Sequence, residues 1–130
     1  MGLIDDLKEI ASKFKLLEIK NQLTEGTVNI FLGGKHYHIT PPPEVDLQRI
    51  ASTDVTPELQ NQFQETLRRS IDFSGNVVAS LPEEEQNKTI AAITVASAAK
   101  VLDPIITIVE GVGVEEFVAV EIKDPNTDSP

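Results

Sequence analysis

The amino-acid sequence predicts one domain of the α+β class, with an N-terminal amphipathic helix, a β-hairpin, central helices and a C-terminal strand or hairpin. Three observations support this prediction: a helical apolar pattern at the N-terminus, two β-prone runs that flank a pair of glycines, and an alanine-rich apolar stretch. The domain is expected to span residues 1–123, with a helix and hairpin over 1–40 and a helical part with C-terminal strands over 44–123. Residues 124–130 are polar, include two prolines and are expected to form a disordered tail.

The first element is predicted to be one continuous amphipathic helix from Leu3 to Leu23. Its apolar residues recur at alternating steps of four and three and therefore line one face, which comprises Leu3, Leu7, Ile10, Phe14 and Leu17. The spacing lasts for about two heptads, which is too short to predict a coiled coil. This stripe either packs on its own domain or forms a contact with another molecule. Membrane attachment is disfavoured because residues 1–20 hold four acids and four lysines, so the polar face is not basic.

Two β-prone runs, Thr27–Leu32 and Lys35–Thr40, flank Gly33 and Gly34 and predict a hairpin, because glycine adopts the positive φ angles of a tight turn at little cost. The alternation of the strands places on the core side Val28, Ile30, Leu32, Tyr37 and Ile39. The other side carries Asn29, Phe31, His36 and His38. We expect the C-terminal strands to join this hairpin in one sheet, because the pairing would hide strand edges.

The middle of the chain is predicted to be helical. Three prolines, Pro41–Pro43, end the second strand because none can donate a backbone hydrogen bond. A short helix is expected at Glu44–Ala51, followed by a firmer helix that Thr56 caps and that ends near Ile71. The glutamine-rich faces of this helix are expected to meet water. Its apolar stripe consists of Leu59, Phe63 and Leu67.

The next helix is predicted to begin at a capping box formed by Ser80 and Glu83 and to run to about Leu102. From Ile90 onward it is apolar nearly all round. Small side chains keep this helix narrow, namely those of Ala91, Ala92, Ala96, Ala98 and Ala99. Such a helix is expected at the centre of the domain, because neighbouring elements can approach its backbone closely.

The C-terminal part is predicted to supply strands. Residues 103–109 are ambiguous: Asp103 and Pro104 suggest the start of a helix, whereas the apolar run that follows suggests a buried strand, which we favour. Residues 117–122 predict a closing strand, because their alternation places Val118, Val120 and Ile122 on one side.

Composition restricts the classes of partner. The net charge of −10 disfavours nucleic acid, because it repels phosphate groups over the whole surface. The chain has no cysteine, which excludes disulfides and thiolate metal sites and favours a cytoplasmic location. The first residues are acidic where a signal peptide is basic, and no apolar run approaches the ~20 residues that span a bilayer. Stable membrane insertion is therefore not expected.

The two histidines are the main candidates for metal or acid–base chemistry. His36 and His38 project from one face of a strand about 6.6 Å apart. A metal site needs further ligands, and the nearest acids in sequence, Glu44 and Asp46, lie beyond three prolines. The glycine pair lacks the spacing of a phosphate loop, and no serine lies in a Gly-x-Ser-x-Gly elbow. We therefore assign no catalytic, metal-binding or cofactor-binding residue.

These patterns favour a non-enzymatic interaction or regulatory protein whose partner is another protein or a second copy of itself. The residues expected to carry the contact are Leu3, Leu7, Ile10, Phe14, Leu17, Phe31, His36 and His38. Two alternatives stay open. One is an acidic inhibitor or immunity-type protein that masks a basic partner. The other is a small metal-binding protein or enzyme centred on His36 and His38.

Overall fold

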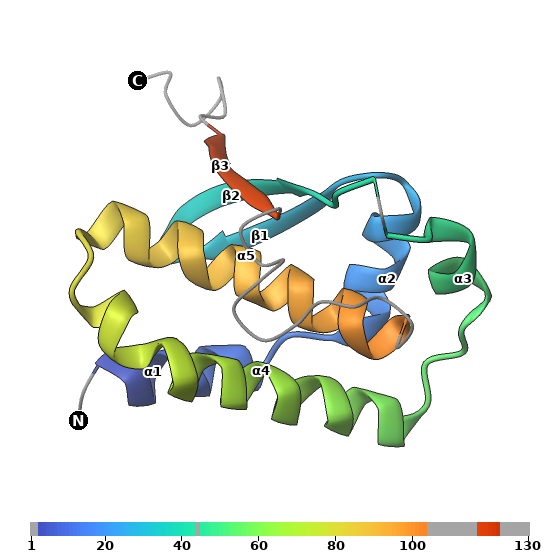
Figure 1. Cartoon of the computed structure of the whole chain (residues 1–130), viewed down its shortest axis with the longest axis horizontal. Coiled ribbons are helices and arrows are strands. Elements are labelled where there is room, and N and C mark those ends of the chain that lie inside the picture. The colour runs from blue at the N-terminus through green and yellow to red at the C-terminus, as the bar shows by residue number, and fades with distance from the viewer. Residues whose placement is uncertain (1–2, 44, 104–116, 123–130) are drawn as a thin grey trace.

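Five helices and a three-stranded antiparallel sheet make up the described part of the chain, which covers residues 3–43, 45–103 and 117–122 of a computed structural model (Figure 1). The helices are α1 (Leu3–Ala11), α2 (Leu16–Thr24), α3 (Leu47–Ser52), α4 (Pro57–Ala79) and α5 (Glu83–Leu102). The strands, in the order β1-β2-β3, are β1 (Val28–Leu32), β2 (Lys35–Thr40) and β3 (Val118–Ile122). The arrangement confirms the predicted α+β class, including the hairpin and the C-terminal strand that joins it.

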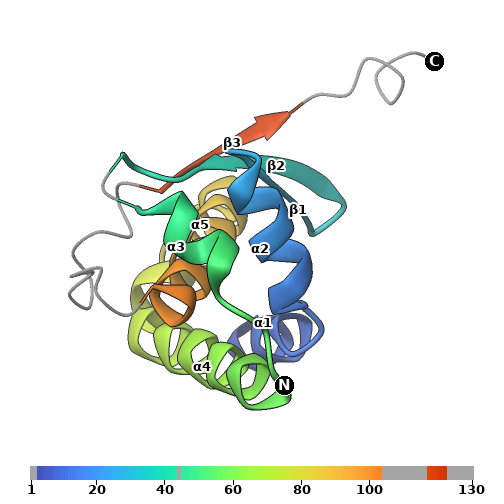
Figure 2. The same ribbon diagram turned by 90° about the vertical axis from the view of Figure 1, so that its right-hand side faces the viewer.

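Helix α5 lies at the centre of the molecule, between the sheet and α4. It contacts all three strands as well as α2, α3 and α4, and α1 packs on α4 from outside. Figure 2 shows the sheet as one layer with the helices beneath it. The inner face of the sheet is therefore covered by helices, whereas no described element packs against its outer face.

The alanine-rich stretch of α5 is buried as predicted. Every residue from Ile90 to Ala99 is buried, because small side chains allow neighbours to approach the helix from several directions. Thr94 is buried among them, and its hydroxyl donates a hydrogen bond to the Ile90 carbonyl at 2.7 Å. The only strongly polar side chains of α5 lie in its first turns and at its end, where water can reach them.

The predicted continuous helix Leu3–Leu23 is wrong, because the chain breaks at residues 12–15 and forms two helices. The backbone groups between the two helices form hydrogen bonds with side chains of α4. Gln60 donates through Nε2 to the Phe14 carbonyl at 3.0 Å, and its Oε1 accepts from the Leu16 N–H at 2.8 Å. Gln64 Nε2 donates to the Ser12 carbonyl at 2.6 Å. These amides replace the hydrogen bonds that a helix interior would supply.

The same contacts correct a second expectation. The glutamine-rich faces of α4 do not all meet water, because Gln60 and Gln64 are half-buried against the break. Gln62, which lies between them on another side of the helix, is exposed as expected. A primary amide is suited to this position because it both donates and accepts.

Helix α4 extends further than predicted. The expected end near Ile71 is wrong, because the buried stripe of the helix continues through Gly75 and Val78. Ser80 then ends the helix, and its hydroxyl donates to the Val77 carbonyl at 2.7 Å.

The capping box predicted at Ser80 and Glu83 is also wrong. Helix α5 begins at Glu83 with Pro82 at its N-cap and without a side-chain cap. The proline disfavours a helical conformation in Leu81, which the capping box would require as the first helical residue.

The short helix after the prolines is shifted from the predicted Glu44–Ala51 to α3, Leu47–Ser52. The shift follows from Asp46, whose carboxylate accepts hydrogen bonds from the N–H groups of Gln48 and Arg49 and so caps the helix at its start. The strand predicted at residues 103–109 lies outside the described residues apart from Asp103, which ends α5, and so does the tail at 124–130.

Candidate protein-interaction face

The hairpin forms in the predicted register. Gly33 and Gly34 have φ angles of 62° and 76°, the left-handed conformation that a two-residue turn requires. Gly33 has a second constraint, since a Cβ atom there would lie 2.8 Å from Nδ2 of Asn87 on α5. The strands pair from Leu32 with Lys35 to Val28 with Ile39. The core side is buried as predicted, at Val28, Ile30, Leu32, Tyr37 and Ile39.

Strand β3 extends the opposite side of the hairpin. It pairs with β2 so that Val120 lies beside His38 and Ile122 lies beside His36. We call the resulting surface the outer face, and it comprises Asn29, Phe31, His36, His38, Val120 and Ile122. Its members form two rows across the strands, Asn29–His38–Val120 and Phe31–His36–Ile122.

Direct contacts fix the polar part of the outer face. The rings of Phe31 and His36 are stacked, with centroids 4.5 Å apart and planes inclined by 15°. The Oδ1 atom of Asn29 lies 3.1 Å from Nε2 of His36 and 3.4 Å from Nδ1 of His38. One amide oxygen is therefore within hydrogen-bonding distance of both imidazoles.

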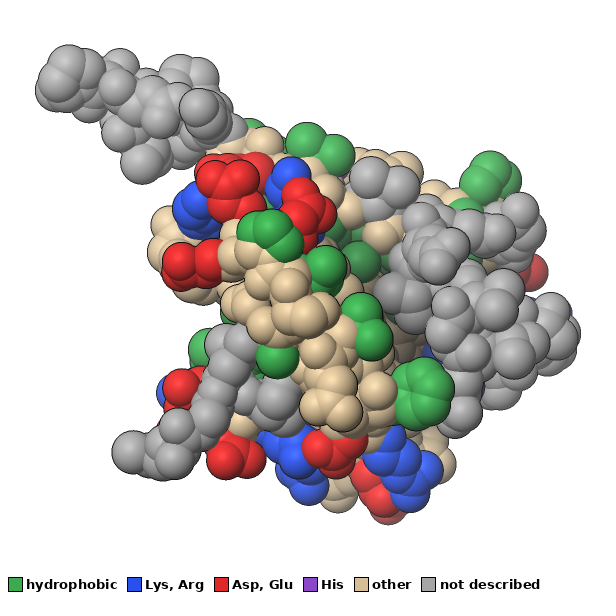
Figure 3. Space-filling model, turned by 60° about the vertical axis from the view of Figure 1, so that its left-hand side comes forward, with side chains coloured by type: hydrophobic (Ala, Val, Ile, Leu, Met, Phe, Trp, Pro, Cys, Tyr) green, Lys and Arg blue, Asp and Glu red, His purple; other side chains and the backbone are tan. Residues whose placement is uncertain are grey.

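The outer face carries no permanently charged side chain. Phe31 is 70% exposed and Val120 is 54% exposed, which makes them two of the most exposed large apolar residues of the described chain. The nearest ion pair in the sheet, Lys35 with Glu121 at 3.8 Å, belongs to positions that alternate onto the opposite side. Figure 3 shows a different side of the molecule, where exposed apolar side chains lie in separate spots among polar atoms and charged groups of both signs gather.

Beneath the outer face, Tyr37 is fully buried. Its hydroxyl makes no hydrogen bond within ordinary geometric limits to any residue that the structure describes. Burial raises the pKa of this hydroxyl above its ordinary value, and the nearby amide of Asn87 offsets part of the rise. The hydroxyl is therefore protonated over the physiological range.

The N-terminal stripe does not form one surface. Leu7 is buried in the core and Phe14 is half-buried against it, whereas Ile10 and Leu17 are exposed. The side chain of Leu3 lies outside the described residues. The break at residues 12–15 separates the members of the stripe, and α2 uses a different set to reach the core, namely Leu16, Ile19 and Leu23.

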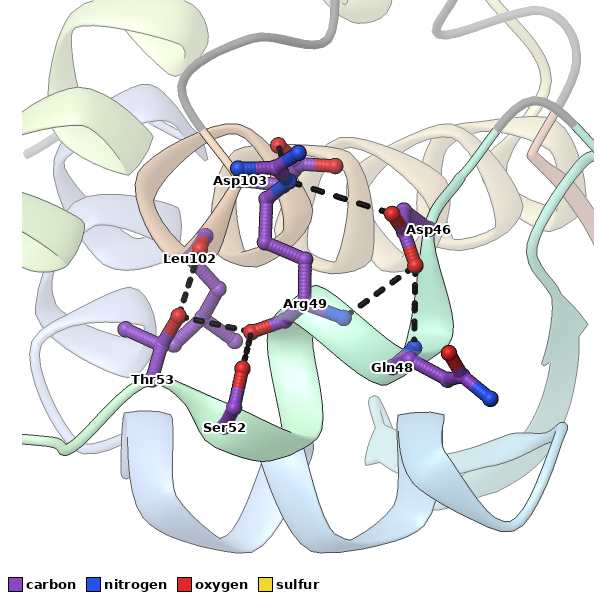
Figure 4. Close-up of polar contacts among 7 residues, drawn as sticks. All are labelled: Asp46, Gln48, Arg49, Ser52, Thr53, Leu102 and Asp103. Carbon is purple, nitrogen blue, oxygen red and sulfur yellow. Dashed lines mark hydrogen bonds and ion pairs between the residues drawn. The ribbon is translucent and has the colours of Figure 1, made fainter.

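A second polar cluster joins α3 to the end of α5, and no local pattern in the sequence indicates it. Figure 4 shows Arg49 between the carboxylates of Asp46 and Asp103, with Nε at 3.8 Å and 3.4 Å from their oxygens. Thr53 donates to the Leu102 carbonyl at 3.2 Å beside this pair. Asp103 is buried whereas Asp46 and Arg49 are exposed, so the cluster joins the two helices at the surface of the protein.

Within residues 3–43, 45–103 and 117–122, no group of three or more histidine, aspartate and glutamate side chains lies together as a metal site requires. Among those residues, no helix combines the length and the apolar character needed to cross a membrane. No protein-family model, curated protein or solved structure matches the chain. The outer face is accordingly the candidate site on the geometry of its own residues.

Proposed function

We propose that this chain is a non-enzymatic protein-interaction module that binds a protein partner through the outer face. One observation carries the proposal: six neighbouring side chains on three strands carry no permanent charge, in a protein with a net charge of −10, and no described element covers them. The centres of protein interfaces are depleted of charged residues and enriched in aromatic ones. A cytoplasmic location is part of the proposal and rests on the absence of cysteine.

The size of the outer face determines the kind of partner. Three strands ~4.8 Å apart, with five residues each at a rise of ~3.3 Å, cover roughly 240 Å². A standard protein interface buries ~800 Å² on each partner. We therefore propose a short apolar segment as the occupant, held by Phe31 and Val120. Since the surrounding protein is strongly acidic, lysines or arginines that flank this segment would add long-range attraction.

The test is a selection of short random peptides displayed on phage against the full chain, followed by affinity measurements on three proteins. These proteins are the wild type, Val120→Lys and Gln62→Lys. Both variants add one positive charge at an exposed position, but Gln62 lies on α4 and away from the sheet. The comparison therefore separates an effect at the outer face from an effect of net charge.

The selected peptides are expected to have an apolar centre and basic flanks. Val120→Lys is expected to weaken their binding by about tenfold or more, whereas Gln62→Lys leaves it unchanged. Binding should also weaken as salt is added, because the attraction of the basic flanks is screened. A selection that yields no binding peptide, or peptides that bind Val120→Lys as well as the wild type, would contradict the proposal.

A further inference from the structure

Strand β1 is an edge strand of the described sheet, and half of its backbone groups point outward. The two-residue turn makes Leu32 and Lys35 the first hydrogen-bonded pair, so hydrogen-bonded pairs recur at every second residue. The N–H and C=O groups of Asn29 and Phe31 consequently point away from β2. A contact confirms this direction, because the Asn29 N–H donates to Oε1 of Gln22 on α2 at 2.7 Å.

The edge of β1 lacks three of the devices that usually prevent strand pairing, and α2 reaches it through Gln22. Its five residues include no charged side chain and no proline, and its pairing with β2 runs without a bulge. Among the described residues, Gln22 makes the only hydrogen bond to the outward backbone of β1. The opposite edge of the sheet differs, because β3 carries Glu121 among its five residues.

We propose that β1 pairs edge to edge with β1 of a second copy of this chain, in an antiparallel arrangement about Ile30. This inference goes beyond the proposed function, because it uses the strand edge and leaves the outer face free. In this register Asn29 of each copy lies opposite Phe31 of the other, so the Asn29 N–H exchanges its bond to Gln22 for one to the Phe31 carbonyl of the second copy, and the Phe31 N–H gains the Asn29 carbonyl. Ile30 lies opposite its own counterpart on the inner side. The product is a six-stranded sheet with one continuous outer face.

The absence of charged side chains on β1 allows a second copy to occupy this edge. Two chains of net charge −10 repel each other, and they approach at least cost where neither presents a charged side chain. The sequence Val-Asn-Ile-Phe-Leu meets that condition, and antiparallel pairing about its central residue sets Val28 opposite Leu32. Since added salt screens the repulsion between the two bodies, dimerisation is expected to strengthen with ionic strength. A basic partner on the outer face would show the opposite dependence.

The experiment measures the association of the full chain by sedimentation equilibrium over a hundredfold range of concentration, in about 50 mM and about 500 mM NaCl. The wild type is expected to form a dimer, and to a greater extent in the higher salt. Phe31→Pro removes an outward N–H without removing a bond to β2, and it is expected to weaken the dimer by about tenfold or more. Phe31→Ala is the matched control, because it removes the ring and keeps the N–H group.

Hydrogen exchange gives a readout that does not depend on a variant folding. The Phe31 amide is expected to exchange more slowly as the wild-type concentration rises, while the outward Asn29 amide of the monomer is already protected by Gln22. A wild-type chain that stays monomeric, a Phe31 amide whose exchange rate is independent of concentration, or a dimer that a folded Phe31→Pro retains would each overturn the inference. None of these results changes the outcome of Val120→Lys, which tests the outer face separately.

Discussion

The imidazole of His36 stacks on the ring of Phe31, and both side chains stand on the outer face at directly paired positions of β1 and β2. Pairs of this kind, which lie between the hydrogen-bonded positions of a hairpin, bring their side chains closest together. The stack therefore holds Phe31, the most exposed large apolar residue of the outer face, in a fixed position before any partner arrives.

This stack is expected to contribute to the stability of the hairpin. A double-mutant cycle with Phe31→Ala and His36→Ala, measured by urea unfolding, should give a favourable coupling free energy of about 0.5–1.5 kcal/mol. The reason is that each single change removes the same ring contact. A coupling close to zero would show that the two rings are neighbours without energetic consequence. The corresponding cycle of Phe31 with Thr40, which has no contact with it in the pairing register, is the control.

The break between α1 and α2 is expected to depend on α4. Gln60→Ala removes two hydrogen bonds to the backbone of residues 14 and 16 and should lower the free energy of unfolding by about 1–3 kcal/mol. Gln62→Ala, two residues away and exposed, should change it by less than about 0.5 kcal/mol. Thermal or urea unfolding measures both, and equal effects of the two changes would contradict the assigned role of Gln60.

The ionisation of Tyr37 is open to direct observation, because the chain has one tyrosine and no tryptophan. Its pKa is raised above the ordinary 10.0 because burial penalises the phenolate. The neutral group therefore contributes stability that is fully present below pH 10 and is lost as pH rises through the pKa of the folded state. A titration of near-ultraviolet absorbance should show a midpoint above that of free tyrosine. An ordinary midpoint in the folded protein would contradict this.

Replacing Tyr37 by phenylalanine tests the same group in a second way. The variant should unfold at neutral pH with a free energy equal to that of the wild type or about 1 kcal/mol higher, because the lost hydroxyl has no well-formed hydrogen bond. Its stability should also lose the part of the alkaline pH dependence that Tyr37 causes. A destabilisation of more than about 2 kcal/mol would show that the hydroxyl is satisfied.

The ion pair between Arg49 and Asp103 is expected to contribute more to the free energy of unfolding than the exposed pair between Arg69 and Glu65. The side chain of Asp103 is 4% exposed, so Arg49→Ala leaves a buried carboxylate with less compensation and should cost about 1–2 kcal/mol. Arg69 pairs with Glu65 on an exposed part of α4, and Arg69→Ala should cost less than about 0.5 kcal/mol. Equal losses of unfolding free energy in Arg49→Ala and Arg69→Ala would contradict the expected difference between the buried and the exposed ion pair.

The parts of the fold that the sequence predicts correctly depend on local patterns. Two glycines and alternating side chains determine the register of the hairpin, and small apolar residues around every side of Ile90–Ala99 mark a central helix. The composition of the outer face followed from the same alternation for β1 and β2. The third strand of the sheet was predicted from the general rule that an exposed strand edge pairs with another strand.

The wrong prediction of one continuous N-terminal helix and the missed cluster at Asp103 both depend on residues that are distant in sequence. No residue near 12–15 predicts a break in the helix. The side chains that hydrogen-bond the backbone there, Gln60 and Gln64, lie more than 40 positions later in the sequence. The apolar spacing from Leu3 to Leu17 matches a single helix, yet Leu17 is exposed and Leu16 is buried. The cluster around Asp103 was missed for the same reason, since its partner Arg49 belongs to another helix.

The central position of α5 has a consequence for how the protein is made. Strands β1 and β2 leave the ribosome long before residues 83–102, yet their apolar side is covered in the finished protein by that later helix. During synthesis Val28, Ile30 and Tyr37 of the hairpin therefore stay exposed to solvent for several seconds, because translation proceeds at ~5–20 residues per second. Slow translation ahead of α5 would prolong this exposure, and a chaperone that holds the nascent hairpin would act in that interval.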